Sequence, residues 1–123
     1  MKKIALFLIA LQAGAHHSTA PFDMTKSTTI HGVVTEFRWM NPHSYIYLEV
    51  DGHKWTLEAE ALNLLRRYGW TKESLKSGDE ISCTGARAKD GEVYAMKCFT
   101  VELPDGRKLS ATPTGPPTAG VSK

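Results

Sequence analysis

The sequence has few of the features that mark enzymes, nucleic-acid-binding proteins or membrane spans. It contains no Gly-x-Ser-x-Gly motif and no glycine-rich phosphate loop. Lysine and arginine form no cluster of the kind that binds a phosphate backbone. Only two cysteines are present, and the expected strands bring neither beside a histidine. We therefore expect a binding or structural protein that is not an enzyme and has no nucleic-acid partner.

The first fifteen residues are typical of a secretory signal peptide. Lys2 and Lys3 precede an apolar run, residues 4–11, that is too short to span a bilayer, and Ala13-Gly14-Ala15 is a small-x-small cleavage site. Cleavage there makes His16 the first residue of the mature chain and lowers the formal net charge from +2 to 0, because both lysines are lost. We expect a protein of the periplasm or the extracellular space, without a transmembrane segment after cleavage.

Strand signals dominate the rest of the chain. Period-two alternation and turn residues predict strands at 28–40, 43–50, 53–59, 80–88 and 92–103, with a brief sixth segment near Lys108 and Leu109. Residues 61–68 follow a helical period, and Gly69 marks the end of that helix. Three strands, one short helix and two strands are the order of a mainly β, OB-like antiparallel barrel. An open α+β sheet is the alternative.

This pattern divides the chain into four parts. We expect a signal peptide at 1–15, an extended N-terminal segment at 16–27, the OB-like β-barrel domain at 28–110, and a disordered Pro/Gly/Thr-rich tail at 111–123. A change in the phase of the apolar residues around Gly32 predicts a β-bulge or a strongly curved first strand.

The Asn41-Pro42-His43 corner joins the first two strands. Alternation after the corner places Ile46, Leu48 and Val50 toward the core and leaves Tyr45 and Tyr47 on the opposite face. We expect Trp55 and Trp70 to pack in the core. The candidate ligand-binding face consists of Trp39, Asn41, Tyr45 and Tyr47.

Cys83 and Cys98 lie on the two strands that flank Asp90-Gly91. If these two residues form a symmetric two-residue turn, the cysteines lie directly opposite each other. In an oxidising compartment such a pair favours a disulfide. Two reduced buried thiols, or a thiolate pair that binds a metal, are the alternatives.

Histidines provide the candidate metal ligands. After cleavage His16 offers an α-amine and an imidazole that chelate one metal ion, and the imidazoles of His17 and His43 would complete a nitrogen donor set that suits Cu(II). Met24 and Met40 would supply thioether sulfur for Cu(I). The alternative is that the His16-His17 pair is solvated and that His43 hydrogen-bonds to the adjacent turn.

Four other titratable residues carry weaker signals. His31 and His53 lie on separate strands without a partner at a ligand spacing, so we expect surface or cross-strand contacts for both. Glu58 and Glu60 lie two residues apart at the junction between strand and helix, so they would share a face if the strand continued, but we expect them to be solvated.

Several motifs together resemble a family of small secreted bacterial proteins of unknown function. They are His16-His17-Ser18, Phe22-Asp23, Trp39-x-Asn41-Pro42-His43, residues 64–70 (LLRRYGW) and Gly78-Asp79. The resemblance extends from His16 to about Leu109 and implies a secreted, single-domain, β-rich protein without an assigned activity. The cysteine pair is not part of the family pattern. The resemblance directs attention to His16, His17 and His43 as one group of candidate ligands.

Two functions follow as hypotheses, and a purely structural protein of the cell envelope is a third option. The first is a periplasmic copper-binding protein that uses the mature N-terminal histidine and the Asn-Pro-His corner. The second is a metal-free OB-type module whose tyrosine face binds an oligosaccharide, a peptide or a protein. Metal analysis of exported protein, compared with a copy that retains a residue before His16, separates them.

Overall fold

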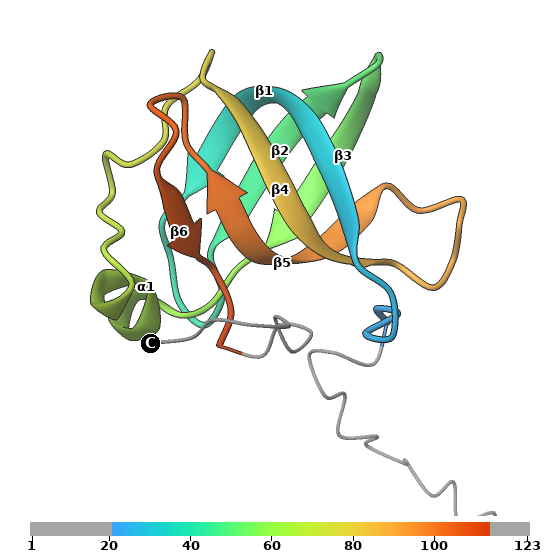
Figure 1. The fold of residues 1–123 in the computed structure, drawn as a ribbon, viewed down its shortest axis with the longest axis horizontal. Helices are drawn as coiled ribbons and strands as arrows, with labels where there is room; N and C mark the ends of the chain where they lie inside the picture. The colour runs from blue at the N-terminus through green and yellow to red at the C-terminus, as the bar shows by residue number, and fades with distance from the viewer. Residues whose placement is uncertain (1–20, 114–123) are drawn as a thin grey trace, which may run out of the picture.

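The computed structural model describes residues 21–113, which fold into a small β-barrel with one short helix (Figure 1). The elements are β1 (Thr28–Arg38), β2 (Tyr45–Val50), β3 (His53–Glu58), α1 (Leu62–Arg67), β4 (Glu80–Arg87), β5 (Ala95–Glu102) and β6 (Lys108–Ser110). Each strand and the helix expected from the sequence is present. The signal peptide, His16, His17 and most of the expected tail lie outside the described residues.

The strands close into a barrel in the order expected for an OB-like fold. Neighbours follow the order β3-β2-β1-β4-β5-β6, and a parallel pairing of β3 with β5 closes five of the strands into a ring. β6 is an additional strand that pairs with β5. The OB-like prediction is therefore confirmed, and the alternative of an open α+β sheet is wrong because β3 has a partner on both sides.

β1 is strongly curved, as the change in apolar phase predicts, but the irregularity lies further along the strand. The register against β2 shifts between Val34 and Glu36, so Val34 points into the core before the shift and Phe37 packs against the core after it. Gly32 has a different role. A Cβ atom at this position would collide with the carbonyl of Glu49 and the side chain of Val50.

The barrel interior is apolar. The alternation predicted for β2 and β3 holds, because Ile46, Leu48, Leu57 and Trp55 are all buried. Trp70 is buried too, and its indole Nε1 donates a hydrogen bond to the carbonyl of Ser110 at 2.7 Å. The main core consists of Val34, Ile46, Leu48, Trp55, Leu57, Ala59, Leu65, Trp70, Leu75, Ile81, Cys83, Met96, Cys98, Val101, Leu103 and Ala111.

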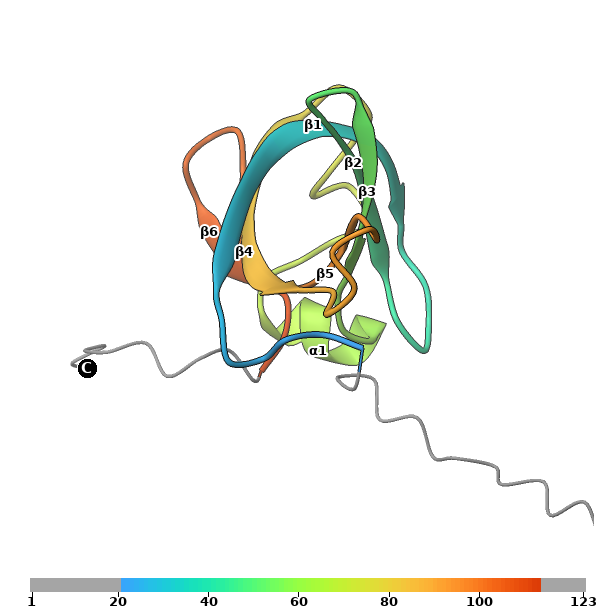
Figure 2. The same cartoon turned by 90° about the vertical axis from the view of Figure 1, so that its right-hand side faces the viewer.

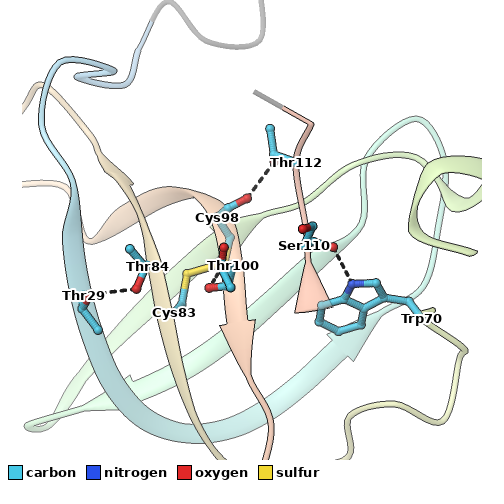
Figure 3. Close-up of a disulfide and its surroundings, with 8 residues drawn as sticks. All are labelled: Thr29, Trp70, Cys83, Thr84, Cys98, Thr100, Ser110 and Thr112. Atoms are coloured by element: carbon cyan, nitrogen blue, oxygen red, sulfur yellow. Dashed lines mark hydrogen bonds between the residues drawn. A yellow bond between two sulfur atoms is a disulfide. The ribbon is translucent and has the colours of Figure 1, made fainter. Parts of the chain in front are cut away.

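A disulfide joins Cys83 on β4 to Cys98 on β5 inside this core (Figure 3). The predicted bond is confirmed, but the predicted register is wrong. Cys83 faces Val101 and Cys98 faces Gly85, so the bond runs diagonally between Cα atoms 6.2 Å apart. The cause is a register shift after Thr84, together with a connection of seven residues, 88–94, in place of a two-residue turn.

Three segments gather at one end of the barrel. Figures 1 and 2 show α1, the connection between β1 and β2, and the N-terminal segment 21–27 all at the same end. Phe22 anchors the N-terminal segment in a second apolar cluster with Ala86 and Phe99, against which Met24 and Ala95 pack. We call residues 21–24 the N-terminal strap.

The strap and the residues that directly follow β6 are held to the barrel by hydrogen bonds. Asp23 donates to the carbonyl of Arg87, and Lys89 donates to the carbonyl of Pro21, both at 2.9 Å. Ordered contacts also continue past Ser110, where the tail was expected to begin. Ala111 and Thr112 are buried, and the Thr112 hydroxyl donates to the carbonyl of Cys98 at 2.7 Å.

Within residues 21–113, no helix has the length and apolarity required to cross a bilayer.

Candidate functional site

The corner between β1 and β2 is held by its own polar side chains. The Asn41–Pro42 peptide bond is cis. The Ser44 hydroxyl is buried, donates to the carbonyl of Met40 at 3.1 Å and accepts from the Met40 N–H at 3.2 Å. These contacts fix the backbone on both sides of Pro42, so the corner presents His43 from a defined position.

Asn41, expected on a ligand-binding face, caps the helix. Ala61 is the N-cap residue of α1 and offers no side-chain acceptor. The Oδ1 atom of Asn41 instead accepts the N–H of Leu62 at 3.0 Å, which satisfies one of the free donors at the start of the helix. Asn41 therefore ties the corner to α1.

His43 is oriented by the end of β3. Its side chain is 25% exposed, and Nδ1 lies 3.3 Å from the carbonyl oxygen of Ala59 and 3.7 Å from Oε1 of Glu58. A carbonyl oxygen is an acceptor, so in a neutral imidazole this contact favours the tautomer with the proton on Nδ1 and the lone pair on Nε2. The described residues offer Nε2 no hydrogen bond. This is the arrangement in which metal-binding histidines are held.

Glu58 and Glu60 were expected to be solvated, and this prediction is wrong. Their side chains are only 13% and 18% exposed because both point toward Lys97 on β5. The Lys97 ammonium lies 3.8 Å from Oε2 of Glu58 and 3.5 Å from Oε1 of Glu60. His43, Glu58, Glu60 and Lys97 form what we call the buried charge cluster. Its two carboxylates face one ammonium, so one negative charge remains beside His43.

Lys97 was missed by the sequence analysis. It is 1% exposed, and its Nζ atom makes no hydrogen bond within the described residues. Its neighbours on the same face are Glu58 across the β3–β5 pairing and Ala86 across β4. The local signal was present, since a lysine stands within Ala95–Phe99, a segment otherwise without charge. Its meaning depended on the parallel pairing of β3 with β5, which alternation alone does not show.

The two tyrosines of the expected binding face lie on the outer surface of β2. Tyr45 is half-buried, and this burial raises the pKa of its hydroxyl above the ordinary value, with smaller contributions from Glu58 and Tyr47. The ring of Tyr47 lies between the Arg38 guanidinium at 5.0 Å and the Lys54 ammonium at 5.1 Å. Both tyrosines therefore face outward as predicted.

Trp39 was also expected on this face. It packs against the core with its ring 5.9 Å from that of Phe37, and the Arg66 guanidinium lies 5.7 Å from its ring centre.

The two methionines expected as ligands differ in their surroundings. Met24 packs against the apolar cluster of Phe22 and Phe99, whereas Met40 is 42% exposed at the corner that carries His43. Within residues 21–113, no three histidine, cysteine or acidic side chains converge in a way that would hold a metal ion.

The remaining described histidines have the surface contacts expected for them. Nδ1 of His31 hydrogen-bonds to the Ser82 hydroxyl on the neighbouring strand at 3.0 Å. His53 stacks on Tyr94, with ring centres 4.3 Å apart. Neither takes part in the buried charge cluster.

The comparisons with known proteins concern family and fold. No protein with a curated description matches the chain significantly. Among solved structures, one match is a crystal structure of TiaS in complex with a transfer RNA and ATP, with 15% sequence identity and a TM-score of 0.49. The match covers 67% of this chain and 19% of that one, so this chain spans about a fifth of its length. A family model described as "Family of unknown function (DUF6152)" matches residues 5–97, and the chain belongs to this family.

Proposed function

We propose that the mature protein binds copper in the periplasm or outside the cell, through the α-amine and imidazole of His16 and Nε2 of His43. His17 would add a further imidazole, and Met40 would offer a thioether when the metal is Cu(I). The proposed role is storage or delivery of copper, or protection against it, without catalysis. The observation that carries the proposal is the orientation of His43, whose Nδ1 lies 3.3 Å from the Ala59 carbonyl oxygen while Nε2 makes no hydrogen bond within residues 21–113.

The position of the strap supports the proposal. Phe22 packs on Ala86, and three strand spacings separate Ala86 from Tyr45 along the row Ala86, Lys97, Glu58, Tyr45. Three spacings amount to about 15 Å. Four residues lie between His16 and Pro21, and the five residue steps from one to the other extend to at most about 17 Å. A fully extended segment of this length would span the distance to Tyr45, the first residue of β2 after the corner.

Electrostatics favours a cation at this place. The buried charge cluster leaves one negative charge uncompensated next to His43, on the side of the ring that bears the proton. A carboxylate on that side makes the imidazole a stronger donor through its other nitrogen. The disulfide is compatible with an oxidising compartment, in which the proposed export would place the protein.

The test compares three forms of the protein: one exported with its own signal, one that retains a methionine before His16, and a His43→Ala variant. We expect the exported protein to bind one copper ion and the other two to bind it at least about a hundredfold more weakly, because each lacks a ligand. His31→Ala is the matched control, since His31 hydrogen-bonds to Ser82 away from the corner. Equal copper affinity in all forms would contradict the proposed ligands.

A second candidate is a metal-free binding module, supported by the outer face of β2. Tyr47 presents an aromatic ring between Arg38 and Lys54, and this face of an OB-like barrel is a common place for ligands. Exported protein that binds no copper, but loses affinity for an anionic oligosaccharide on Tyr47→Ala substitution, would favour this candidate.

A further inference from the structure

We propose that Asp51 is a site of covalent modification, at which the link to Gly52 isomerises to isoaspartate through a succinimide ring. The inference is separate from the proposed copper function, since no candidate ligand takes part in it. The chain holds three Asp-Gly steps, at 51–52, 90–91 and 105–106, and a glycine leaves the attacking nitrogen unhindered by a Cβ atom. All six residues are exposed, so exposure does not distinguish the three steps.

The reaction needs only the side chain, the following peptide group and water. The nitrogen of Gly52 attacks Cγ of Asp51, an N–Cγ bond forms, and the carboxyl OH leaves with the N–H proton as water. The ring is then opened by one water molecule. When this water breaks the bond between the nitrogen and the former main-chain carbonyl carbon, the chain continues through Cβ and Cγ. The product is isoaspartate, and its mass is unchanged.

The turn between β2 and β3 can reach the geometry of ring closure while the strands stay paired. Asp51 and Gly52 have φ values of 49° and 80°, both positive as a type I′ turn requires. Ring closure needs a ψ of about −120° at the aspartate, which is the value at the first central residue of a type II′ turn. Both types join hairpin strands, so a flip of this one peptide group supplies the geometry and leaves Val50 paired with His53.

No hydrogen bond of the turn opposes the flip. Among the hydrogen bonds of residues 21–113, none involves the carbonyl or the carboxylate of Asp51 or the N–H of Gly52. The space beside Gly52 is open as well, because a Cβ atom there would meet no other atom within 4 Å. The carboxyl and the nitrogen of this step are therefore both free to react.

The second Asp-Gly step is held by the connection between β4 and β5. Oδ1 of Asp90 accepts the N–H of Glu92 at 2.9 Å, and the carbonyl of Asp90 accepts the N–H of Val93 at 3.1 Å. Rotation of the carboxylate toward the nitrogen of Gly91 breaks the first bond, and a flip of the peptide group breaks the second. We therefore expect slower reaction at Asp90 than at Asp51.

The third step is held most firmly. The Asp105 carboxylate accepts the N–H of Arg107 at 3.0 Å and its Nε at 2.7 Å, and the N–H of Gly106 donates to the carbonyl of Leu103 at 2.9 Å. The bonds from Arg107 lower the pKa of Asp105, so less of this carboxyl is in the protonated form that loses water. Asp105 should be the slowest of the three.

Isoaspartate at position 51 would alter the turn that sets the register of β2 and β3. The main chain gains one carbon atom, whereas a two-residue hairpin turn has a fixed length. The register places Ile46 and Leu48 of β2 and Trp55 and Leu57 of β3 in the core. The modified protein should therefore be less stable than the natural one.

The experiment is to incubate the folded protein at physiological temperature and pH, and to measure isoaspartate at each step by peptide mapping with electron-transfer fragmentation. We expect Asp51 to react fastest, and the other two to be slower by about fivefold for each hydrogen bond that must break. In protein unfolded in urea, the three steps should react at similar rates. A folded protein in which Asp90 or Asp105 reacts first would overturn the proposal, as would the same ranking in the unfolded chain.

Two variants connect the modification to stability. Asp51→Glu should form no isomer at this position, because a six-membered ring closes far more slowly, and Asp90→Glu is the matched control that keeps the rate at Asp51. After incubation, the natural protein and Asp90→Glu should have lost stability in urea denaturation, and Asp51→Glu should not. An equal loss in all three would overturn the proposal. The ranking in the natural protein needs neither variant, so it stays decisive if one of them fails to fold.

Discussion

The barrel interior and the end of the barrel that carries α1 both contain buried side chains. Those of the interior are apolar, whereas those at the α1 end include charged groups. The interior is apolar and contains a disulfide between Cys83 and Cys98. The α1 end contains the buried charge cluster, in which Lys97 is as inaccessible as the core leucines. One region gains stability from the removal of apolar surface from water, and the other must compensate for charges removed from water.

This difference indicates where function belongs in the molecule. A buried ion pair contributes little net stability compared with apolar packing of the same volume. The buried charge cluster therefore has no evident structural advantage over an apolar one, and its position beside His43 agrees with a role at the candidate site. The disulfide, in contrast, joins β4 and β5, two strands that are already paired with each other.

The largest expected effect is at the α1 end. Lys97→Ala leaves Glu58 and Glu60 buried without a counter-charge, so we expect a loss of about 3–5 kcal/mol in the free energy of unfolding. Lys76→Ala, which removes a solvent-exposed ammonium that lies 3.2 Å from Asp79, should cost less than about 1 kcal/mol. Urea denaturation measures both. Equal losses in the two variants would show that the burial of Lys97 does not increase its contribution to the free energy of unfolding.

The disulfide should come next. The bond closes a loop with a sequence separation of 15, and a loop of that length corresponds to about 3 kcal/mol of stabilisation. The double variant Cys83→Ala/Cys98→Ala should lose this amount in denaturant unfolding, and a reducing agent should destabilise the natural protein but not the double variant. If a reducing agent leaves the free energy of unfolding of the natural protein unchanged, this prediction is contradicted.

The interior could be predicted from the sequence because its signals are local. Alternation placed Ile46 and Leu48 inward, and the order of strands and helix was enough to indicate an OB-like barrel. The errors in this region arose where one residue was inserted or a turn was lengthened. The shift after Thr84 moved Cys98 opposite Gly85, a change that the symmetric turn at Asp90-Gly91 did not allow for.

The α1 end could not be predicted because its contacts are distant in sequence. Lys97 meets Glu58 and Glu60 only because β3 and β5 run side by side in parallel, a pairing that connects strands separated by a helix and β4. Asn41 caps a helix that begins twenty-one residues later, and a sequence window around Ala61 contains no capping side chain. His43 was recognised as a candidate, but the atoms that orient it were not.

Asn41 offers a smaller test of the link between the corner and α1. Asn41→Ala removes the acceptor for the Leu62 N–H and should cost about 1 kcal/mol in the free energy of unfolding. Asn63→Ala is the matched control, because Asn63 is exposed on α1 and alanine favours the helix. Thermal unfolding of both variants measures the effect. A stability loss in the control, and none in Asn41→Ala, would show that the cap is not needed.

The smallest expected effect is the pH dependence that the α1 end imposes on the face of β2. Partial burial, followed by the Glu58 carboxylate, raises the pKa of Tyr45 above 10.0, so the folded protein holds this proton more tightly than the unfolded chain does. The resulting stabilisation is present below pH 10 and is lost as the pH rises through the pKa of the folded state. Relative to Tyr45→Phe, the natural protein should therefore lose stability above pH 10 in urea denaturation. A difference between the two proteins that stays constant across this window would show that Glu58 and burial do not act on Tyr45.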